Sequence, residues 1–218
     1  MSLVIAYRDE TNGMYYIAGD SAVSIGNGGK NVLGPRTKKV FRAYNHPDIL
    51  VGIVGDFRYS PLFANADLFE GYDQTFSEAD EYRFMYNTVS PRLLKTINDD
   101  ARIEAVKDHD EYNFGALIVT KNGIYDIDRD FSVATYEDEY AAIGVGRITA
   151  SAVLYVMDDY EEDVIKKITS AMQASIEYID GINYPIHIFT EAFSHDYDKR
   201  TELVLRNTTS TFIIDETK

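Results

Sequence analysis

Residues 2–20 read SLVIAYRDETNGMYYIAGD and contain two apolar runs separated by a turn. The runs cover residues 3–7 and 14–18, and both contain the β-branched and aromatic residues that favour strands. Between them lies Asn12-Gly13, the dipeptide that two-residue hairpin turns prefer. The second run ends at Gly19-Asp20. This stretch therefore predicts a β-hairpin at the start of the chain, with an aspartate where the return strand ends.

The rest of the chain shows strand and helix patterns in separate runs. Two-residue alternation or short apolar runs predict strands at 38–44, 49–55, 114–120, 124–127, 131–134, 140–145, 185–189, 202–205 and 211–214. Apolar residues at helical spacing predict helices at 61–69, 79–94, 148–157 and 162–179. We expect Pro91 to break or kink the second helix, and we expect a loop at 26–31, which is rich in glycine.

The order of these elements is strands, two helices, strands, two helices and strands. Segregated runs of this kind indicate an α+β fold. Two sheets and two helix pairs predict a four-layer αββα sandwich. No linker, repeat or low-complexity tract interrupts the chain. We therefore expect residues 1–218 to form a single domain.

Composition excludes several classes of function. The formal net charge of −15 would repel a phosphate backbone, which argues against nucleic-acid binding. The absence of cysteine excludes disulfides, thiol nucleophiles and thiolate metal sites. The four histidines lie in no metal-binding or hydrolase motif, so no metal or cofactor is expected, and His187 is interpreted as a strand residue. The N-terminus lacks signal-peptide features and glycines interrupt the most apolar stretch, so we expect no membrane span and a cytoplasmic protein.

Four short motifs occur in a fixed order along the chain. They are Ala18-Gly19-Asp20, Lys38-Lys39-Val40, Val51-Gly52-Ile53-Val54-Gly55, and Ala142-Ile143-Gly144-Val145-Gly146 before a predicted helix. This ordered set resembles proteasome β-subunits, and most closely the HslV peptidase, from Ser2 to about Phe189. The resemblance implies the fold of N-terminal-nucleophile hydrolases. It also implies a homo-oligomeric ring that cleaves unfolded polypeptide substrates, with an AAA+ unfoldase as partner.

The same resemblance assigns roles to particular residues. Ser2 aligns with the nucleophile, and its α-amine becomes the base once Met1 is removed, because a hydroxyl needs a base to react. Asp20 and Lys39 align with the buried pair, and a lysine ammonium about 4 Å away lowers the pKa of such an amine by up to about 3 units at an effective dielectric of ~20. Gly55 aligns with the glycine whose N–H stabilises the oxyanion. Glu177 and Asp180 align with the supporting polar residues, and Lys38 is expected to face solvent.

Several positions depart from the family pattern. The nucleophile is usually threonine, and a serine usually occupies the position of Val145, whose side chain cannot form a hydrogen bond. Glu177 stands for an aspartate and Asp180 for a serine. Ordinary structural roles remain open for several of these residues: a turn for Asp20 and Asp180, a strand end for Gly55, and an unprocessed terminus for Ser2. Three functions therefore stay open: a peptidase ring, a catalytically silent proteasome-like scaffold, and a small-molecule amidohydrolase.

Overall fold

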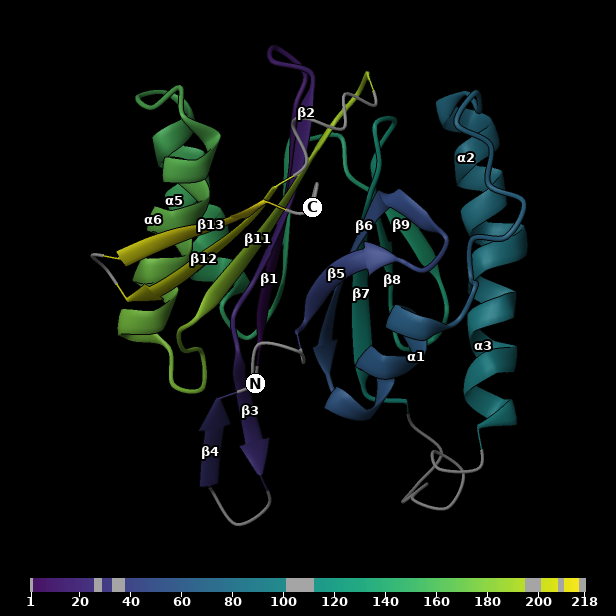
Figure 1. Cartoon of the computed structure of the whole chain (residues 1–218), viewed down its shortest axis with the longest axis horizontal. Coiled ribbons are helices and arrows are strands. Elements are labelled where there is room, and N and C mark those ends of the chain that lie inside the picture. The colour runs from purple at the N-terminus through teal and green to yellow at the C-terminus, as the bar shows by residue number, and fades with distance from the viewer. Residues whose placement is uncertain are drawn as a thin grey trace.

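The computed structural model describes residues 2–25, 29–32, 38–100, 112–194, 201–207 and 210–215 (Figure 1). A six-stranded antiparallel sheet has the order β10-β1-β2-β11-β12-β13. Its strands are β1 (Leu3–Asp9), β2 (Met14–Gly19), β10 (Tyr140–Gly144), β11 (Ile186–Ala192), β12 (Thr201–Asn207) and β13 (Ser210–Asp215).

A five-stranded antiparallel sheet has the order β5-β6-β7-β8-β9. Its strands are β5 (Val40–Ala43), β6 (His46–Gly55), β7 (Phe114–Val119), β8 (Ile124–Ile127) and β9 (Val133–Thr135). A separate hairpin is formed by β3 (Ala22–Ile25) and β4 (Gly29–Val32). The helices are α1 (Ser60–Asn65), α2 (Glu78–Phe84), α3 (Ser90–Asp99), α5 (Arg147–Asp158) and α6 (Val164–Tyr178).

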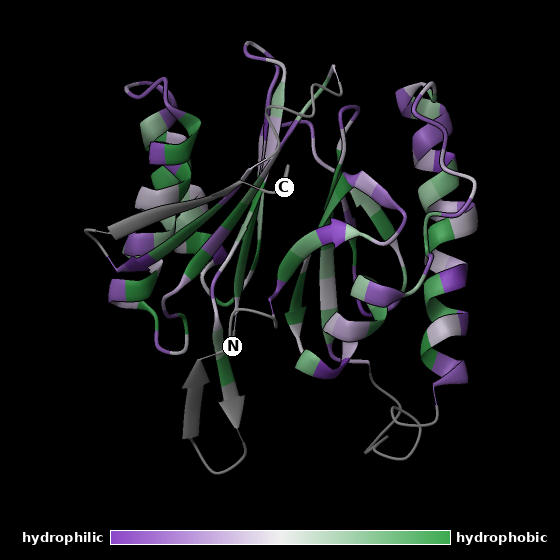
Figure 2. Cartoon of the chain, viewed as in Figure 1, coloured by the Kyte–Doolittle hydropathy of each residue, from purple (hydrophilic) through white to green (hydrophobic). Residues whose placement is uncertain are grey.

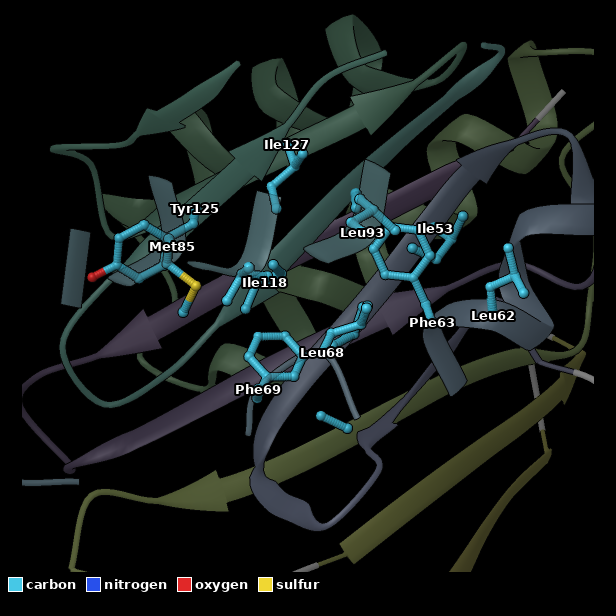
Figure 3. Packing of buried hydrophobic residues seen from close by; sticks show 14 of the residues in the cluster. Ile53, Leu62, Phe63, Leu68, Phe69, Met85, Leu93, Ile118, Tyr125 and Ile127 are labelled. Atoms are coloured by element: carbon cyan, nitrogen blue, oxygen red, sulfur yellow. The ribbon is translucent and has the colours of Figure 1, made fainter. Parts of the chain in front are cut away.

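The helices lie on the outer sides of the two large sheets. Figure 1 shows α5 and α6 beside the six-stranded sheet, and α2 and α3 beside the five-stranded sheet. Buried side chains form one apolar cluster under each helix pair, and Figure 3 shows the cluster between α1–α3 and the five-stranded sheet. A third cluster joins residues of the two sheets, including Val4, Leu50 and Leu117. Figure 2 shows apolar residues along the central strands, whereas the outer helices alternate between polar and apolar residues.

Strand β1 explains why the two sheets pack face to face. It pairs with β10 on one side and β2 on the other, so neither edge is free. Alternate residues point to opposite faces: Leu3 and Ile5 join the cluster under α5 and α6, whereas Val4 joins the cluster between the sheets. A strand that is apolar on both faces requires cover on both faces. The α+β class with two sheets, predicted from the sequence, is therefore confirmed, and both large sheets are antiparallel.

Some elements differ from their prediction. Residues 29–31 lie in β4 rather than in a loop, while 26–28 fall outside the described residues. Pro91 lies in the first turn of α3, directly after a π-helical turn at Met85–Val89 that separates α3 from α2, so the helix predicted at 79–94 is interrupted just before Pro91, as expected. The helix predicted at 61–69 ends at Asn65 as α1. In the described part of the chain, no helix has the length and apolar character needed to cross a bilayer.

Candidate active site

A cavity of about 660 Å³ is lined by residues of both large sheets. Ser2 enters it from the start of β1, Lys39 from the residue before β5, and Gly55 from the end of β6. Gly144 and Val145, between β10 and α5, complete this part of the lining. Three residues predicted for the site, Ser2, Lys39 and Gly55, thus share one cavity although 53 positions separate the first from the last.

Asp20 is buried beside this cavity, directly after β2. Its Oδ1 accepts hydrogen bonds from the Lys39 Nζ at 2.8 Å and the Leu3 N–H at 2.9 Å. Its Oδ2 accepts hydrogen bonds from the Ala22 N–H at 2.9 Å and the Asn183 N–H at 3.4 Å. A buried carboxylate with this many donors is held in one orientation. Asp20 therefore does more than close a turn, because it ties Lys39 to the strand that follows Ser2.

Lys39 is only 4 % exposed and forms a buried ion pair with Asp20. Burial lowers the pKa of Lys39 below its ordinary value, although the Asp20 carboxylate acts in the opposite direction. The carbonyl of Lys39 accepts a hydrogen bond of 2.8 Å from the Ile53 N–H, which fixes its backbone against β6. A lysine held this way supplies a positive charge, or a nearby proton, at a defined point of the cavity.

Ser2 is 4 % exposed, and its backbone is fixed from two sides. Its carbonyl accepts a hydrogen bond of 2.9 Å from the Val145 N–H, and the next N–H, that of Leu3, donates to Asp20. Gly144 lies against it with a φ of +97°, and a Cβ at this position would stand 2.2 Å from the Ser2 carbonyl oxygen. Glycine is therefore required at 144, both for the left-handed conformation and for the close approach of Ser2. Met1 lies outside the described residues.

Gly55 ends β6 with a φ of +93°, and a Cβ there would lie 2.3 Å from the Asn113 carbonyl oxygen. The following N–H, that of Asp56, donates to the same carbonyl at 2.7 Å. A side chain is thus excluded at 55, and backbone alone faces the cavity at this point.

Glu177 and Asp180 do not reach the cavity. Glu177 lies on an exposed turn of α6, Asp180 is exposed after that helix ends, and neither lines the cavity. The segment instead contributes Asn183, whose N–H donates to Asp20 and whose carbonyl accepts a hydrogen bond of 3.1 Å from the Ser21 N–H. Because these contacts involve only backbone atoms of Asn183, its side-chain type carried no signal that sequence reasoning could use.

Charged side chains that sequence reasoning did not identify line another part of the cavity: Asp56, Asp126, Asp128, Arg129 and Arg147. Burial raises the pKa of Asp126, although a hydrogen bond from the Tyr136 hydroxyl opposes this. Val145 also borders the cavity and is 46 % exposed. Because its side chain is a valine, it offers no hydroxyl at this position. Among the described residues, no group of three or more His, Asp or Glu side chains is arranged to hold a metal ion.

The fold is proteasome-like, as comparisons with solved structures show. The particular similarities are to solved structures, since no protein-family profile and no curated protein sequence matches the chain. The chain is similar to Thiobacillus denitrificans BPH in complex with epoxomicin, with a TM-score of 0.67 and 21 % identity over 88 % of this chain and 98 % of that one. A second structure, of Thiobacillus denitrificans BPH alone, is similar with a TM-score of 0.65 and 22 % identity over 90 % of this chain and 100 % of that one.

Eukaryotic HslV from Trypanosoma brucei is similar with a TM-score of 0.59 and 17 % identity, covering 86 % of this chain and 98 % of that one. At these identities the likeness is one of fold. The resemblance to HslV-type proteins that the four sequence motifs indicated is therefore confirmed at the level of fold.

Proposed function

We propose that this chain is an N-terminal-nucleophile peptidase with the four-layer αββα sandwich of that class in one domain, residues 1–218. The observation that carries the proposal is the buried ion pair of Asp20 and Lys39, which borders the same cavity as Ser2. A buried ion pair is expensive to keep for stability alone. Its place beside a serine at the start of a strand is what hydrolytic chemistry at an N-terminal residue requires.

The proposed reaction begins with removal of Met1, which leaves Ser2 with a free α-amine. The amine takes the proton of the Ser2 hydroxyl as its oxygen attacks the carbonyl carbon of a peptide bond. The positive charge of Lys39, held by Asp20, keeps the amine neutral and therefore basic. The N–H at Gly55 stabilises the oxyanion.

The tetrahedral intermediate collapses when the leaving amine takes the proton from the Ser2 α-amine, and an ester to Ser2 remains. A water molecule, deprotonated by the same amine, then attacks the ester, and the protonated amine returns this proton to the Ser2 oxygen as the carboxylic acid leaves. Glu177 and Asp180 are left out of this reaction because they are exposed away from the cavity.

We further propose unfolded polypeptides as substrates, a homo-oligomeric ring in the cytoplasm and an AAA+ unfoldase as partner. The exposed face of α5 supports self-association. Ile148, Tyr155 and Val156 are 75 %, 72 % and 56 % exposed on that helix. A helix that is apolar on its outer face as well as its inner face is typical of one that a partner covers.

Intact mass and peptide hydrolysis test the proposal together. Natively expressed protein should lack the mass of Met1 and should hydrolyse fluorogenic peptides, whereas Ser2→Ala should lose turnover. Ser170→Ala, on α6 and outside the cavity, is the matched control and should keep it. Epoxomicin, which is bound in one of the BPH structures, serves as a second probe. It should increase the mass of the wild type but not that of Ser2→Ala.

A catalytically silent scaffold is the second candidate, and Val145 is the observation that favours it, because no hydroxyl supports the α-amine from that position. The scaffold predicts retained Met1, no turnover and no epoxomicin adduct, and these results would contradict the peptidase. Turnover of small amides without turnover of peptides would instead indicate an amidohydrolase on the same fold.

A further inference from the structure

Two consecutive lysines before β5 pair with different buried carboxylates. Lys39 binds Asp20, whereas the Nζ of Lys38 lies 2.5 Å from the Oε2 of Glu202 in β12. The side chains of Lys38 and Glu202 are only 21 % and 3 % exposed. The prediction that Lys38 faces solvent is thus wrong, because a strand 164 positions away brings a carboxylate to it.

Glu202 also binds a buried histidine. Its Oε1 lies 2.8 Å from the Nδ1 of His187 in β11, and the His187 side chain is 4 % exposed. Burial acts to raise the pKa of Glu202, but hydrogen bonds from His187 and Lys38 lower it below its ordinary value. The Nε2 of His187 is buried and has no hydrogen-bond partner among the described residues. Because a carboxylate only accepts hydrogen bonds, the Nδ1–H of His187 donates to Glu202.

This cluster, defined as Lys38, Glu202 and His187, adjoins the Asp20–Lys39 pair. His187 pairs with Gly19 in the ladder between β11 and β2, and Gly19 immediately precedes Asp20. Phe189 lies in the cluster between the sheets, so alternation along β11 directs His187 to the same face. The Lys38 ammonium also lies over the Phe189 ring, 5.0 Å from its centre.

The backbone of the two lysines is fixed on both sides as well. The Ser60 hydroxyl donates to the Lys38 carbonyl at 3.0 Å, and the Ile53 N–H donates to the Lys39 carbonyl at 2.8 Å. With both backbone carbonyls and both ammonium groups bound, Lys39 has one position relative to Asp20. The Lys38–Glu202 and Lys39–Asp20 ion pairs are therefore joined through one short stretch of backbone that is hydrogen-bonded at both residues.

We propose that Lys38, Glu202 and His187 form a positioning cluster that holds Lys39 against Asp20 and sets the charge balance at the candidate nucleophile. The inference rests on the proposed function, because it assigns the cluster a role in that chemistry. Neither Lys38 nor Glu202 nor His187 lines the cavity, so the cluster acts through Lys39.

The size of the effect follows from geometry. Neighbouring Cα atoms lie about 3.8 Å apart, so two diverging lysine side chains place their ammonium groups on the order of 10 Å apart. At that distance and an effective dielectric of ~20 to ~40, one charge shifts the titration of the other by about 0.5 to 1 pH unit. Removing one charge of the Lys38–Glu202 ion pair should therefore shift the titration midpoint of Lys39 by a measurable amount.

Other charges near the two lysines stay constant in the comparison. The groups that line the cavity with Lys39, besides the Ser2 amine, are Asp56, Asp126, Asp128, Arg129 and Arg147. On the adjoining part of β5 and β11, Arg42 and Glu191 pair at 2.8 Å. Since none of these changes in a Lys38 or Glu202 variant, any shift at Lys39 reports the altered cluster.

The test is an NMR titration of Lys39 in protein labelled with ¹³C at the lysine ε-carbon, with the resonance assigned by its loss in Lys39→Arg. Lys38→Met removes a positive charge and should raise the titration midpoint of Lys39 by about 0.5 to 1 pH unit. Glu202→Gln removes a negative charge and should lower it by a similar amount. The double variant should lie near the wild type, and Lys38→Arg, which keeps the charge, should restore it.

Arg83→Met, on the exposed surface of α2, removes a distant charge as the control and should leave the midpoint unchanged. Circular dichroism verifies the fold of every variant, and Lys38→Gln replaces Lys38→Met if the latter does not fold. A purely structural role for the cluster predicts lower stability without opposite shifts. Shifts of the same sign, or none, would overturn the inference.

The same variants link the cluster to turnover. The acidic limb of the pH profile for peptide hydrolysis should move to higher pH in Lys38→Met and to lower pH in Glu202→Gln. The reason is that the proposed base, the Ser2 α-amine, loses a nearby positive charge in the first variant and a nearby negative charge in the second. A wild type without peptide hydrolysis but with opposite shifts at Lys39 would contradict the proposed function while supporting the cluster. Hydrolysis with an unmoved pH profile would contradict the cluster alone.

Discussion

Single residues at the junction of β1, β2 and β10 determine whether the candidate site can form. Asp20 accepts hydrogen bonds from Leu3, Lys39 and Asn183. One carboxylate thus joins the end of β2 to three other parts of the chain. The backbone of Ser2 is fixed on both sides, because the Val145 N–H binds its carbonyl and the Leu3 N–H binds Asp20. The position of the candidate nucleophile therefore depends on backbone contacts with its neighbours.

Gly144→Ala tests this dependence. The left-handed φ costs a non-glycine residue about 1 to 3 kcal/mol, and the new Cβ would also stand 2.2 Å from the Ser2 carbonyl oxygen. We expect reduced stability in urea denaturation, together with a loss of peptide hydrolysis on the order of 100-fold, because small displacements of a reacting group have effects of that size.

Gly71→Ala is the matched control for this variant. Its φ is +88°, but the nearest atom to a new Cβ, on Phe84, lies 4.0 Å away. It should lose stability through backbone strain alone and keep full activity when both variants are assayed under conditions in which they are folded. Equal activity in the two variants would show that the contact between Gly144 and Ser2 does not matter for turnover.

At the scale of elements, local sequence patterns predicted most strands and helices, whereas the sequence did not indicate contacts between distant segments. Apolar alternation and helical spacing predicted the large-sheet strands and the helices α5 and α6, because each of these elements buries a regular face. The hairpin β3–β4 was missed because glycines hide its strand pattern. The interruption expected at Pro91 lies between the π-helical turn and α3, because the first turn of a helix needs no N–H from proline.

The candidate site shows the same division. Asp20, Lys39 and Gly55 were found from short ordered motifs, whereas Glu202 and Asn183 reach the site from far along the chain, with no local pattern that indicates it. Glu177 and Asp180 were assigned through the family resemblance, but both are exposed near the end of α6 at Tyr178. Contacts of this kind depend on strand order, which local sequence periodicity does not encode.

Helix α2 offers a test at this scale. Glu81 is fully buried on it and accepts hydrogen bonds from the Tyr72 hydroxyl at 3.4 Å and from the Asn122 side-chain amide. Burial raises the pKa of Glu81, although its hydrogen bonds oppose this. Because the folded-state pKa lies above the unfolded value, the native state holds the proton more tightly. Stability from this group is therefore present at low pH and is lost as pH rises through the folded-state pKa.

Glu81→Gln imitates the protonated side chain and removes this titration. The melting temperature of the wild type relative to Glu81→Gln should therefore fall as pH rises from about 4.5, the ordinary pKa of glutamate. Asp80→Asn, at an exposed position of the same helix, is the control for a neighbouring acid. A constant difference across this pH range would show that Glu81 does not titrate in a buried environment.

For the whole molecule, the outer face of α5 links assembly to the candidate site. The helix begins at Arg147, which lines the cavity together with Val145, and its exposed apolar residues continue from Ile148 to Val156. A partner bound along α5 would therefore also cover one side of the cavity. The proposed ring would therefore place a second chain beside the candidate site.

Tyr155→Glu tests the link between assembly and activity. The side chain is 72 % exposed, so the fold of a single chain should tolerate the substitution, but a carboxylate buried in an apolar contact is strongly unfavourable. Light scattering after size exclusion should show a multimer for the wild type and a smaller species for the variant, with lower peptide hydrolysis at the same chain concentration. Tyr44→Glu changes a 49 % exposed tyrosine near β5, away from α5, and should leave both assembly and turnover intact. If Tyr155→Glu assembled and hydrolysed peptides as the wild type does, self-association through α5 would be ruled out, and the apolar face would need a different partner.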